Sequence, residues 1–222
     1  MSQKKHKVIV IGLPKTGTST LAVMLRVLDY KVTGPEIDFE VNNEVYLENK
    51  FLAFDGFQDF PWCFEWERFA NCKQTKFIIL HREFESWWKS FYESYGHKNE
   101  RYLSYPYMNI LKIEENKKEF FNFFNSYYQN AKSFSESHPN QVINVNINTL
   151  KWEDICGFLD EKLPKNIFGK VSKQPHVNKY KAKTRRTIRF KIQKNIKTVL
   201  LTVLGQKTYL NLITILRKNN FI

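Results

Sequence analysis

The feature that most constrains the fold of this chain is the loop Gly12-Leu13-Pro14-Lys15-Thr16-Gly17-Thr18-Ser19. It follows the apolar run Val8-Ile9-Val10-Ile11, which is typical of a buried strand, and it precedes a helical pattern of apolar residues that ends at Leu28. A strand, a glycine-containing turn and a helix in this order direct several backbone N–H groups and the positive end of the helix toward one point. The sequence therefore predicts a phosphate-binding loop.

The position of the lysine narrows the chemistry of this loop. A Walker A motif reads G-x-x-x-x-G-K-[ST], whereas here Thr18 follows the second glycine and the lysine is Lys15. The run Pro14-Lys15-Thr16-Gly17-Thr18-Ser19 resembles the 5′-phosphosulfate loop of sulfotransferases that use 3′-phosphoadenosine 5′-phosphosulfate (PAPS). The resemblance implies that Lys15 contacts the phosphate that becomes the leaving group. Taken alone, the motif also fits a generic phosphate loop or a strand–turn–helix without a ligand.

A second motif ends the apolar run Phe77-Ile78-Ile79-Leu80-His81-Arg82. A P-loop kinase would have an aspartate near such a strand end to help hold magnesium, and none stands here. In sulfotransferases an arginine at a strand end and a serine eight residues later bind the 3′-phosphate of PAPS, which implies this role for Arg82 and Ser90. Arginine suits the role because its planar fork donates two hydrogen bonds to phosphate oxygens. The family's usual Arg-Asp-Pro is replaced by Arg82-Glu83-Phe84. Separately, Arg82 and Ser90 also fit a surface arginine and an ordinary helical serine.

Further segments extend the resemblance over most of residues 7–180. The stretch from Phe54 to Trp62 and the run Pro175-His176-Val177-Asn178 are similar to segments of a compact, single-domain branch of the sulfotransferases. The resemblance implies a cofactor-binding set made of Pro14, Lys15, Thr16, Gly17, Thr18, Ser19, Arg82 and Ser90. The Arg-Lys-Gly motif with which larger members of the family cover the cofactor is absent. Lys183 and Arg185 in the basic tail are candidate substitutes that would cap PAPS.

Length and pattern predict one α/β domain, with a core at 1–180 and a basic helical extension at 181–222. Aromatic residues make up 16% of the chain, which argues against disorder. We expect a three-layer, mostly parallel, doubly wound sheet, with strands near 7–12, 31–33, 51–55, 76–81 and 141–147. Helices are expected near 18–29, 40–49, 62–71, 84–96, 114–137 and 150–160.

The charge of the chain is concentrated at its end. From Lys162 onward there are 16 of the 35 basic residues and none of the 22 acidic ones, so all of the +13 excess lies there. This basic tail fits a cap over the cofactor, a patch for anionic acceptors or membrane lipids, or a solvated helical face. Peripheral membrane contact and a homodimer stay open, and we expect no nucleic-acid partner because no binding module accompanies the basic run.

The cysteines and the start of the chain bear on its compartment. The three cysteines, Cys63, Cys72 and Cys156, are odd in number and lack metal-ligand spacing, so we interpret them as reduced thiols. No secretory signal precedes the first strand, which begins by residue 8. We therefore expect a cytoplasmic protein, with membrane association open.

The general base is the least determined part of the site. Asp59 follows the third expected strand and Glu36 follows the second, at the edge where ligands gather in open α/β sheets. Asp59 is slightly favoured over Glu36 as the general base. Asp59 also fits a helix N-cap ahead of Pro61, and Glu36 a solvated loop carboxylate.

The sequence thus predicts a PAPS-dependent sulfotransferase that needs no metal. Its acceptor would be a hydroxyl or amine of a carbohydrate, a lipid or another small molecule. Lys15 would stabilise the leaving phosphate, and Asp59 or Glu36 would act as base. The alternative is a non-catalytic binder of nucleotide phosphates, and a P-loop kinase is less favoured.

Overall fold

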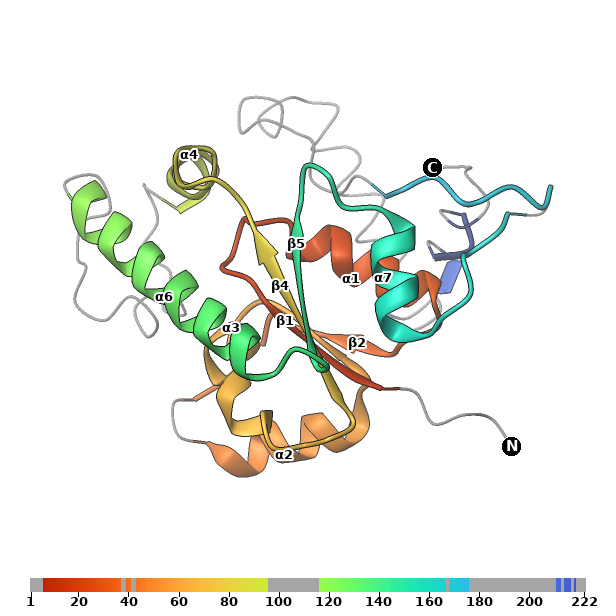
Figure 1. The fold of residues 1–222 in the computed structure, drawn as a ribbon, viewed down its shortest axis with the longest axis horizontal. Helices are drawn as coiled ribbons and strands as arrows, with labels where there is room; N and C mark the ends of the chain where they lie inside the picture. The colour runs from red at the N-terminus through yellow and green to blue at the C-terminus, as the bar shows by residue number, and fades with distance from the viewer. Residues whose placement is uncertain are drawn as a thin grey trace, which may run out of the picture.

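The fold is a five-stranded parallel sheet in the order β2-β3-β1-β4-β5, as a computed structural model shows (Figure 1). The structure describes residues 6–36, 39–40, 43–95, 116–166 and 168–175, together with 211–212, 214–216 and 218. The strands are β1 (Lys7–Ile11), β2 (Val32–Thr33), β3 (Gly56–Phe57), β4 (Thr75–His81) and β5 (Val142–Asn146). The predicted α/β class with a parallel sheet is confirmed.

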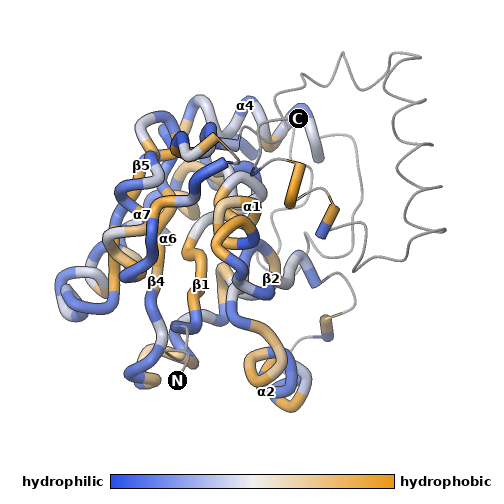
Figure 2. The backbone as a smooth tube through the Cα atoms, turned by 90° about the vertical axis from the view of Figure 1, so that its right-hand side faces the viewer, coloured by the Kyte–Doolittle hydropathy of each residue, from blue (hydrophilic) through white to orange (hydrophobic). Residues whose placement is uncertain are grey.

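Helices cover both faces of the sheet. Helices α1 (Thr18–Val27) and α7 (Trp152–Leu159) pack on one face, while α2 (Glu44–Ala53), α3 (Trp62–Glu65) and α6 (Lys117–Ser137) pack on the other (Figure 1). Successive side chains of a strand point to opposite faces. In β1, Val8 and Val10 join the first core, and Ile9 and Ile11 join the second. A strand buried on both sides is hydrophobic along its length, as β1 is in Figure 2.

The order of the strands fixes where a ligand can bind. The chain passes from β1 to β2 and β3 on one side of β1, and then to β4 and β5 on its other side. Strand β1 pairs with β3 through Ile9 and Phe57, and with β4 through Ile11 and Ile79. In open α/β sheets, ligands bind beyond the carboxyl ends of the strands where the order reverses. In this sheet that place lies at the ends of β1, β3 and β4.

Three predicted elements differ from those in the structure. The apolar residues 51–55, expected as the third strand, largely belong to helix α2, which runs from Glu44 to Ala53 instead of 40–49. Asn43 caps this helix, because its side chain accepts a hydrogen bond from the Tyr46 N–H at 3.0 Å. The real third strand is Gly56–Phe57, only two residues long. The helix expected at 62–71 is divided into α3 and a 3₁₀ helix, Trp66–Phe69.

The remaining described elements lie where the pattern placed them. Helix α4 (Phe84–Tyr95) follows β4, and α6 and α7 fall within the expected ranges. Of the extension at 181–222, residues 211–212, 214–216 and 218 are described, and they are helical. Within the described residues no helix is both long and apolar enough to span a bilayer. The single-domain organisation stays a prediction.

Candidate functional site

The loop between β1 and α1 has a backbone conformation at Gly17 that residues other than glycine rarely adopt. Its φ is 111°, and a Cβ atom there would lie 2.5 Å from the Ile147 Cδ1. The hydroxyl and the N–H of Thr16 both donate to the Leu13 carbonyl, at 2.7 and 3.1 Å. These contacts close a tight turn, which places Lys15 at its tip with a positive φ of 78°.

The start of α1 adds a positive potential to this loop. Gly17 is the N-cap residue and brings no side-chain oxygen to the first N–H groups of the helix, and the first turn contains no acidic residue. A helix N-terminus of this kind favours an anion. Thr18 is buried and Ser19 half-buried in its first turn. Pro14 to Gly17 thus form the loop beyond the carboxyl end of β1, and Thr18 and Ser19 begin α1, where the sequence placed them.

Arg82 connects the second motif directly to this loop. It follows β4, and its Nη1 donates to the Lys15 carbonyl at 2.8 Å while its Nε donates to Ser86 Oγ at 3.0 Å. The guanidinium still has further N–H donors, which could bind a phosphate. Its half-buried position lowers the pKa of Arg82, but arginine stays charged. The two sequence motifs therefore lie in contact.

Ser90 lies on α4, one turn beyond Ser86, so both serines occupy the same side of the helix. The spacing from Arg82 to Ser90 indicated the later serine only. Ser86 was missed, although it is the one that Arg82 contacts. The available signal was the Ser-x-x-x-Ser spacing, which is a weak pattern by itself.

Asp59 lies next to the loop, two residues after β3. Its Oδ2 accepts a hydrogen bond from the Thr18 hydroxyl at 3.3 Å, and its Oδ1 accepts from the Phe60 N–H at 2.9 Å. Burial raises the pKa of this carboxyl, and the two hydrogen bonds and the charge of Lys15 offset only part of that increase. Pro61, not Asp59, is the N-cap residue of α3. Asp59 is therefore a carboxylate of raised basicity beside Lys15.

Glu36 lies three residues after β2, in a different environment. Its carboxylate accepts hydrogen bonds from the hydroxyls of Thr33 and Tyr46, the latter at 2.7 Å, and it pairs with Lys50 at 3.2 Å. Burial alone would raise the pKa of Glu36, but these hydrogen bonds and the Lys50 ammonium hold it below its ordinary value. These three partners lie on β2 and α2, and none of them belongs to the loop.

Several aromatic residues around the loop gave no functional signal in the sequence. The Trp87 indole donates to the Pro14 carbonyl at 2.8 Å, and the Tyr95 ring lies 5.9 Å from the Lys15 ammonium. Tyr128, on α6, donates to the Leu80 carbonyl at 2.9 Å at the end of β4. Aromatic residues at helical spacing indicate core packing, so their contacts with the loop could not be read from the pattern.

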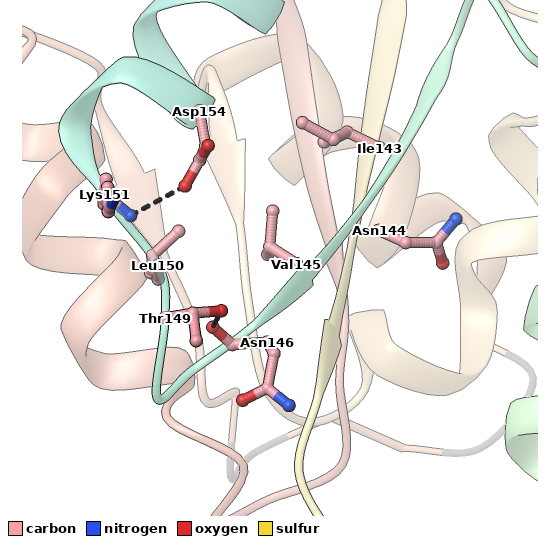
Figure 3. Close-up of a pocket in the computed structure, with 8 residues that line it drawn as sticks. All are labelled: Ile143, Asn144, Val145, Asn146, Thr149, Leu150, Lys151 and Asp154. Atoms are coloured by element: carbon pink, nitrogen blue, oxygen red, sulfur yellow. Dashed lines mark hydrogen bonds between the residues drawn. The ribbon is translucent and has the colours of Figure 1, made fainter.

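A separate cavity of about 260 Å³ lies beside the edge strand β5 and the start of α7 (Figure 3). Its lining comes from residues 143–146, 149–151 and 154, and it includes none of the predicted site residues. The Asp154 carboxylate accepts a hydrogen bond from the Lys151 N–H, so its role there is to cap α7 (Figure 3).

Two predicted contributions to the site cannot be placed. Lys183 and Arg185 lie outside the described residues, so their proposed contact with the cofactor stays a prediction.

Within the described part of the chain, no group of three or more His, Cys, Asp or Glu side chains could hold a metal ion. Cys63, Cys72 and Cys156 are free thiols.

Comparison with known families agrees with the geometry of the loop. No curated protein matches the chain. The family model of the sulfotransferase domain matches residues 7–182, which include β1, the loop, Arg82 and the last strand. Since this match covers most of the 222 residues, the chain belongs to the sulfotransferase domain family.

Proposed function

We propose that the protein is a PAPS-dependent sulfotransferase that transfers a sulfuryl group to a hydroxyl or amine acceptor. The observation that carries the proposal is the 2.8 Å hydrogen bond from Arg82 Nη1 to the Lys15 carbonyl. It brings a lysine-bearing phosphate loop and a strand-end arginine into one site. A nucleotide with phosphates at both its 5′ and 3′ positions needs two such cationic groups side by side.

The residues present fit this cofactor. A side chain at Gly17 would clash with Ile147 and strain the backbone, and the uncapped start of α1 lies at the same turn. Lys15 and the start of α1 would hold the 5′-phosphate, and Arg82 with Ser86 or Ser90 would hold the 3′-phosphate. When bound, PAPS supplies a sulfuryl group on a good leaving group, 3′,5′-bisphosphoadenosine.

The chain's own contribution to the chemistry is electrostatic. Lys15 and the N–H groups of the loop stabilise the negative charge that develops on the leaving oxygen, an effect that can amount to a few kcal/mol for each donor. No metal ligand takes part in this scheme. Lys15→Ala should therefore reduce turnover far more than it weakens binding of bisphosphoadenosine.

Asp59 is the better candidate for the base that accepts the acceptor's proton. Its pKa is raised, and it lies beside Lys15 and Thr18, whereas the pKa of Glu36 is lowered and its oxygens already have Thr33, Tyr46 and Lys50 as partners. A base works best when its pKa approaches the working pH. The proton of the acceptor would move to a carboxylate oxygen of Asp59.

Calorimetric titration with 3′,5′-bisphosphoadenosine, ATP and GTP in parallel tests the proposal. Tight binding of the bisphosphate without magnesium, with weaker binding of ATP and GTP, is the expected result. Preference for ATP with magnesium would indicate a kinase instead. Turnover of PAPS with a panel of alcohols, phenols, sugars, amines and lipids then separates an enzyme from a non-catalytic binder.

Arg82→Ala supplies a second test, aimed at the 3′-phosphate. Loss of a charge-assisted contact should weaken bisphosphoadenosine binding by roughly 1.5 to 3 kcal/mol. The variant should also lose its preference for the nucleotide with a 3′-phosphate over the same nucleotide with a 3′-hydroxyl. A variant that keeps this preference would show that Arg82 has another role.

A further inference from the structure

Two consecutive carbonyls of the phosphate loop accept hydrogen bonds from side chains that follow β4. The Trp87 Nε1 donates to the Pro14 carbonyl at 2.8 Å, and the Arg82 Nη1 donates to the Lys15 carbonyl at the same distance. These two carbonyls belong to the peptide groups on either side of the Lys15 Cα. Hydrogen bonds therefore fix the peptide groups on both sides of Lys15.

The bond from Trp87 fixes the direction of an N–H group. In a planar trans peptide, the carbonyl and the following N–H point in opposite directions. Since the Pro14 carbonyl points toward the Trp87 indole, the Lys15 N–H points away from it. The orientation of this N–H, and of the Cα that bears the lysine side chain, depends on the indole.

Lys15 needs such support because its backbone is strained. Its φ of 78° lies in the left-handed region, which residues other than glycine seldom adopt. Such a conformation persists only where the surrounding structure over-determines it. The hydrogen bonds to the Pro14 and Lys15 carbonyls supply that constraint from outside the loop.

The Trp87 side chain is suited to act as a rigid donor. It is fully buried, and its ring packs against Phe91 and Phe124 at centroid distances of 4.9 Å. Such a bond is not automatic for a buried tryptophan. The indole N–H groups of Trp62 and Trp152 are also buried, and neither has a hydrogen-bond partner in the described part of the chain.

We propose that Trp87 is a positioning residue, whose indole N–H holds the Pro14 carbonyl so that the Lys15 N–H and ammonium face the cofactor's 5′-phosphate. This inference rests on the proposed function, because it assigns the 5′-phosphate to the loop. Trp87 itself touches no reacting atom in this arrangement. Its effect reaches the phosphate through Lys15.

The test compares Trp87→Phe with Trp88→Phe. Phenylalanine keeps an aromatic ring in the core but removes the N–H donor. Trp88 is the matched control because it packs in the same aromatic cluster, on Phe91 and Phe120. Each protein is titrated with 3′,5′-bisphosphoadenosine and with adenosine 3′-monophosphate. The dissociation constant for adenosine 3′-monophosphate divided by that for 3′,5′-bisphosphoadenosine measures what the 5′-phosphate contributes to binding.

Trp87→Phe should lower this ratio about tenfold, the effect of one lost hydrogen bond and an unsatisfied buried carbonyl. Binding of adenosine 3′-monophosphate should stay unchanged, and Trp88→Phe should keep the parent's ratio. A purely structural role would weaken both ligands alike. An unchanged ratio in Trp87→Phe would overturn the inference.

Two further outcomes remain distinguishable. If the parent protein shows no preference for bisphosphoadenosine over the monophosphate, the proposed function fails, whatever Trp87 does. If Trp87→Phe does not fold, 3-benzothienylalanine is incorporated at position 87, because it keeps the shape of the indole and replaces the N–H by sulfur. The same tenfold drop with this residue supports the inference, and its absence overturns it.

Discussion

Asp59 and Glu36 follow neighbouring strands of the same sheet, yet their surroundings act on them in opposite directions. The two regions are directly connected, since the Glu36 N–H donates to the Phe60 carbonyl at 2.7 Å. Burial raises the pKa of Asp59, and its few hydrogen bonds do not compensate. At Glu36, hydroxyl donors and Lys50 reverse the effect of burial. One carboxylate is thus kept basic beside the phosphate loop, and the other is stabilised in its charged form.

The comparison indicates which of the two carboxylates is better suited to accept a proton. A carboxylate that accepts a proton must not be fully satisfied in its charged form, because its pKa would then fall. A carboxylate that connects β2 to α2, in contrast, contributes most to stability when its charged form has a full set of hydrogen-bond and ion-pair partners. Substitution of Asp59 should therefore reduce turnover, whereas substitution of Glu36 should reduce stability.

The largest effect is expected on turnover. Asp59→Asn removes the proposed base and should reduce the rate of sulfuryl transfer by about 10²- to 10⁴-fold. Glu36→Gln, the matched control, should keep turnover close to that of the parent. Binding of bisphosphoadenosine to Asp59→Asn should not weaken, because a negative charge near an anion site is removed. If Glu36→Gln loses turnover as a folded protein and Asp59→Asn does not, the roles are reversed.

The next effect concerns the stability that Glu36 provides. Glu36→Gln should lower the free energy of unfolding at neutral pH by about 1 to 3 kcal/mol, since it weakens charge-assisted bonds with Thr33, Tyr46 and Lys50. The lowered pKa means that this stabilisation is present above about pH 4.3, the ordinary value for glutamate, and is lost as the pH falls through the folded-state pKa. Urea unfolding at several pH values measures both the loss of stability and its dependence on pH. A cost that grows at acid pH would contradict the assignment.

Asp59 should show the opposite dependence on pH. Its pKa is raised in the folded state, so its stabilising contribution is complete below about pH 3.9, the ordinary value for aspartate, and is lost as the pH rises through the folded-state pKa. Asp59→Asn should therefore gain stability relative to the parent as the pH rises. The same unfolding series measures this gain. A variant that is less stable than the parent at neutral pH would show that Asp59 is structural.

The position of the loop between β1 and α1 could be predicted from the sequence. Val8 to Ile11, Gly17 and Lys15 form a local pattern whose geometry is set within one turn, so the loop and its helix could be placed from spacing alone. The third strand could not, because Gly56–Phe57 is too short to leave a pattern and the apolar residues before it complete α2.

The contrast between the two candidate bases depends on contacts between distant parts of the chain. Burial raises the pKa of Asp59, whereas the contacts with Tyr46 and Lys50 help to lower the pKa of Glu36, and no spacing rule reveals either effect. In the phosphate loop, too, the bond from Trp87 to the Pro14 carbonyl joins residues 73 positions apart in the chain. Such contacts exist only once the sheet has formed.

The smallest predicted effect distinguishes two roles of the Thr18 hydroxyl. It donates to Asp59 Oδ2 at 3.3 Å, a long bond, and it also lies in the first turn of α1, where the resemblance to sulfotransferases places a phosphate ligand. Thr18→Val keeps the shape of the side chain and removes the hydroxyl. Because the bond favours the charged carboxylate, its loss should raise the pKa of Asp59 further, at a cost below about 1 kcal/mol.

The acid limb of the pH–rate profile should then move to higher pH in Thr18→Val, while the rate well above that limb stays near the parent's. Thr18→Ser, which keeps the hydroxyl, is the control and should keep the parent's profile. If Thr18→Val weakens bisphosphoadenosine binding and leaves the profile in place, the hydroxyl serves the phosphate alone. Asp59 would then owe its ionisation to Phe60 and Lys15, and its contrast with Glu36 would not depend on the loop hydroxyl.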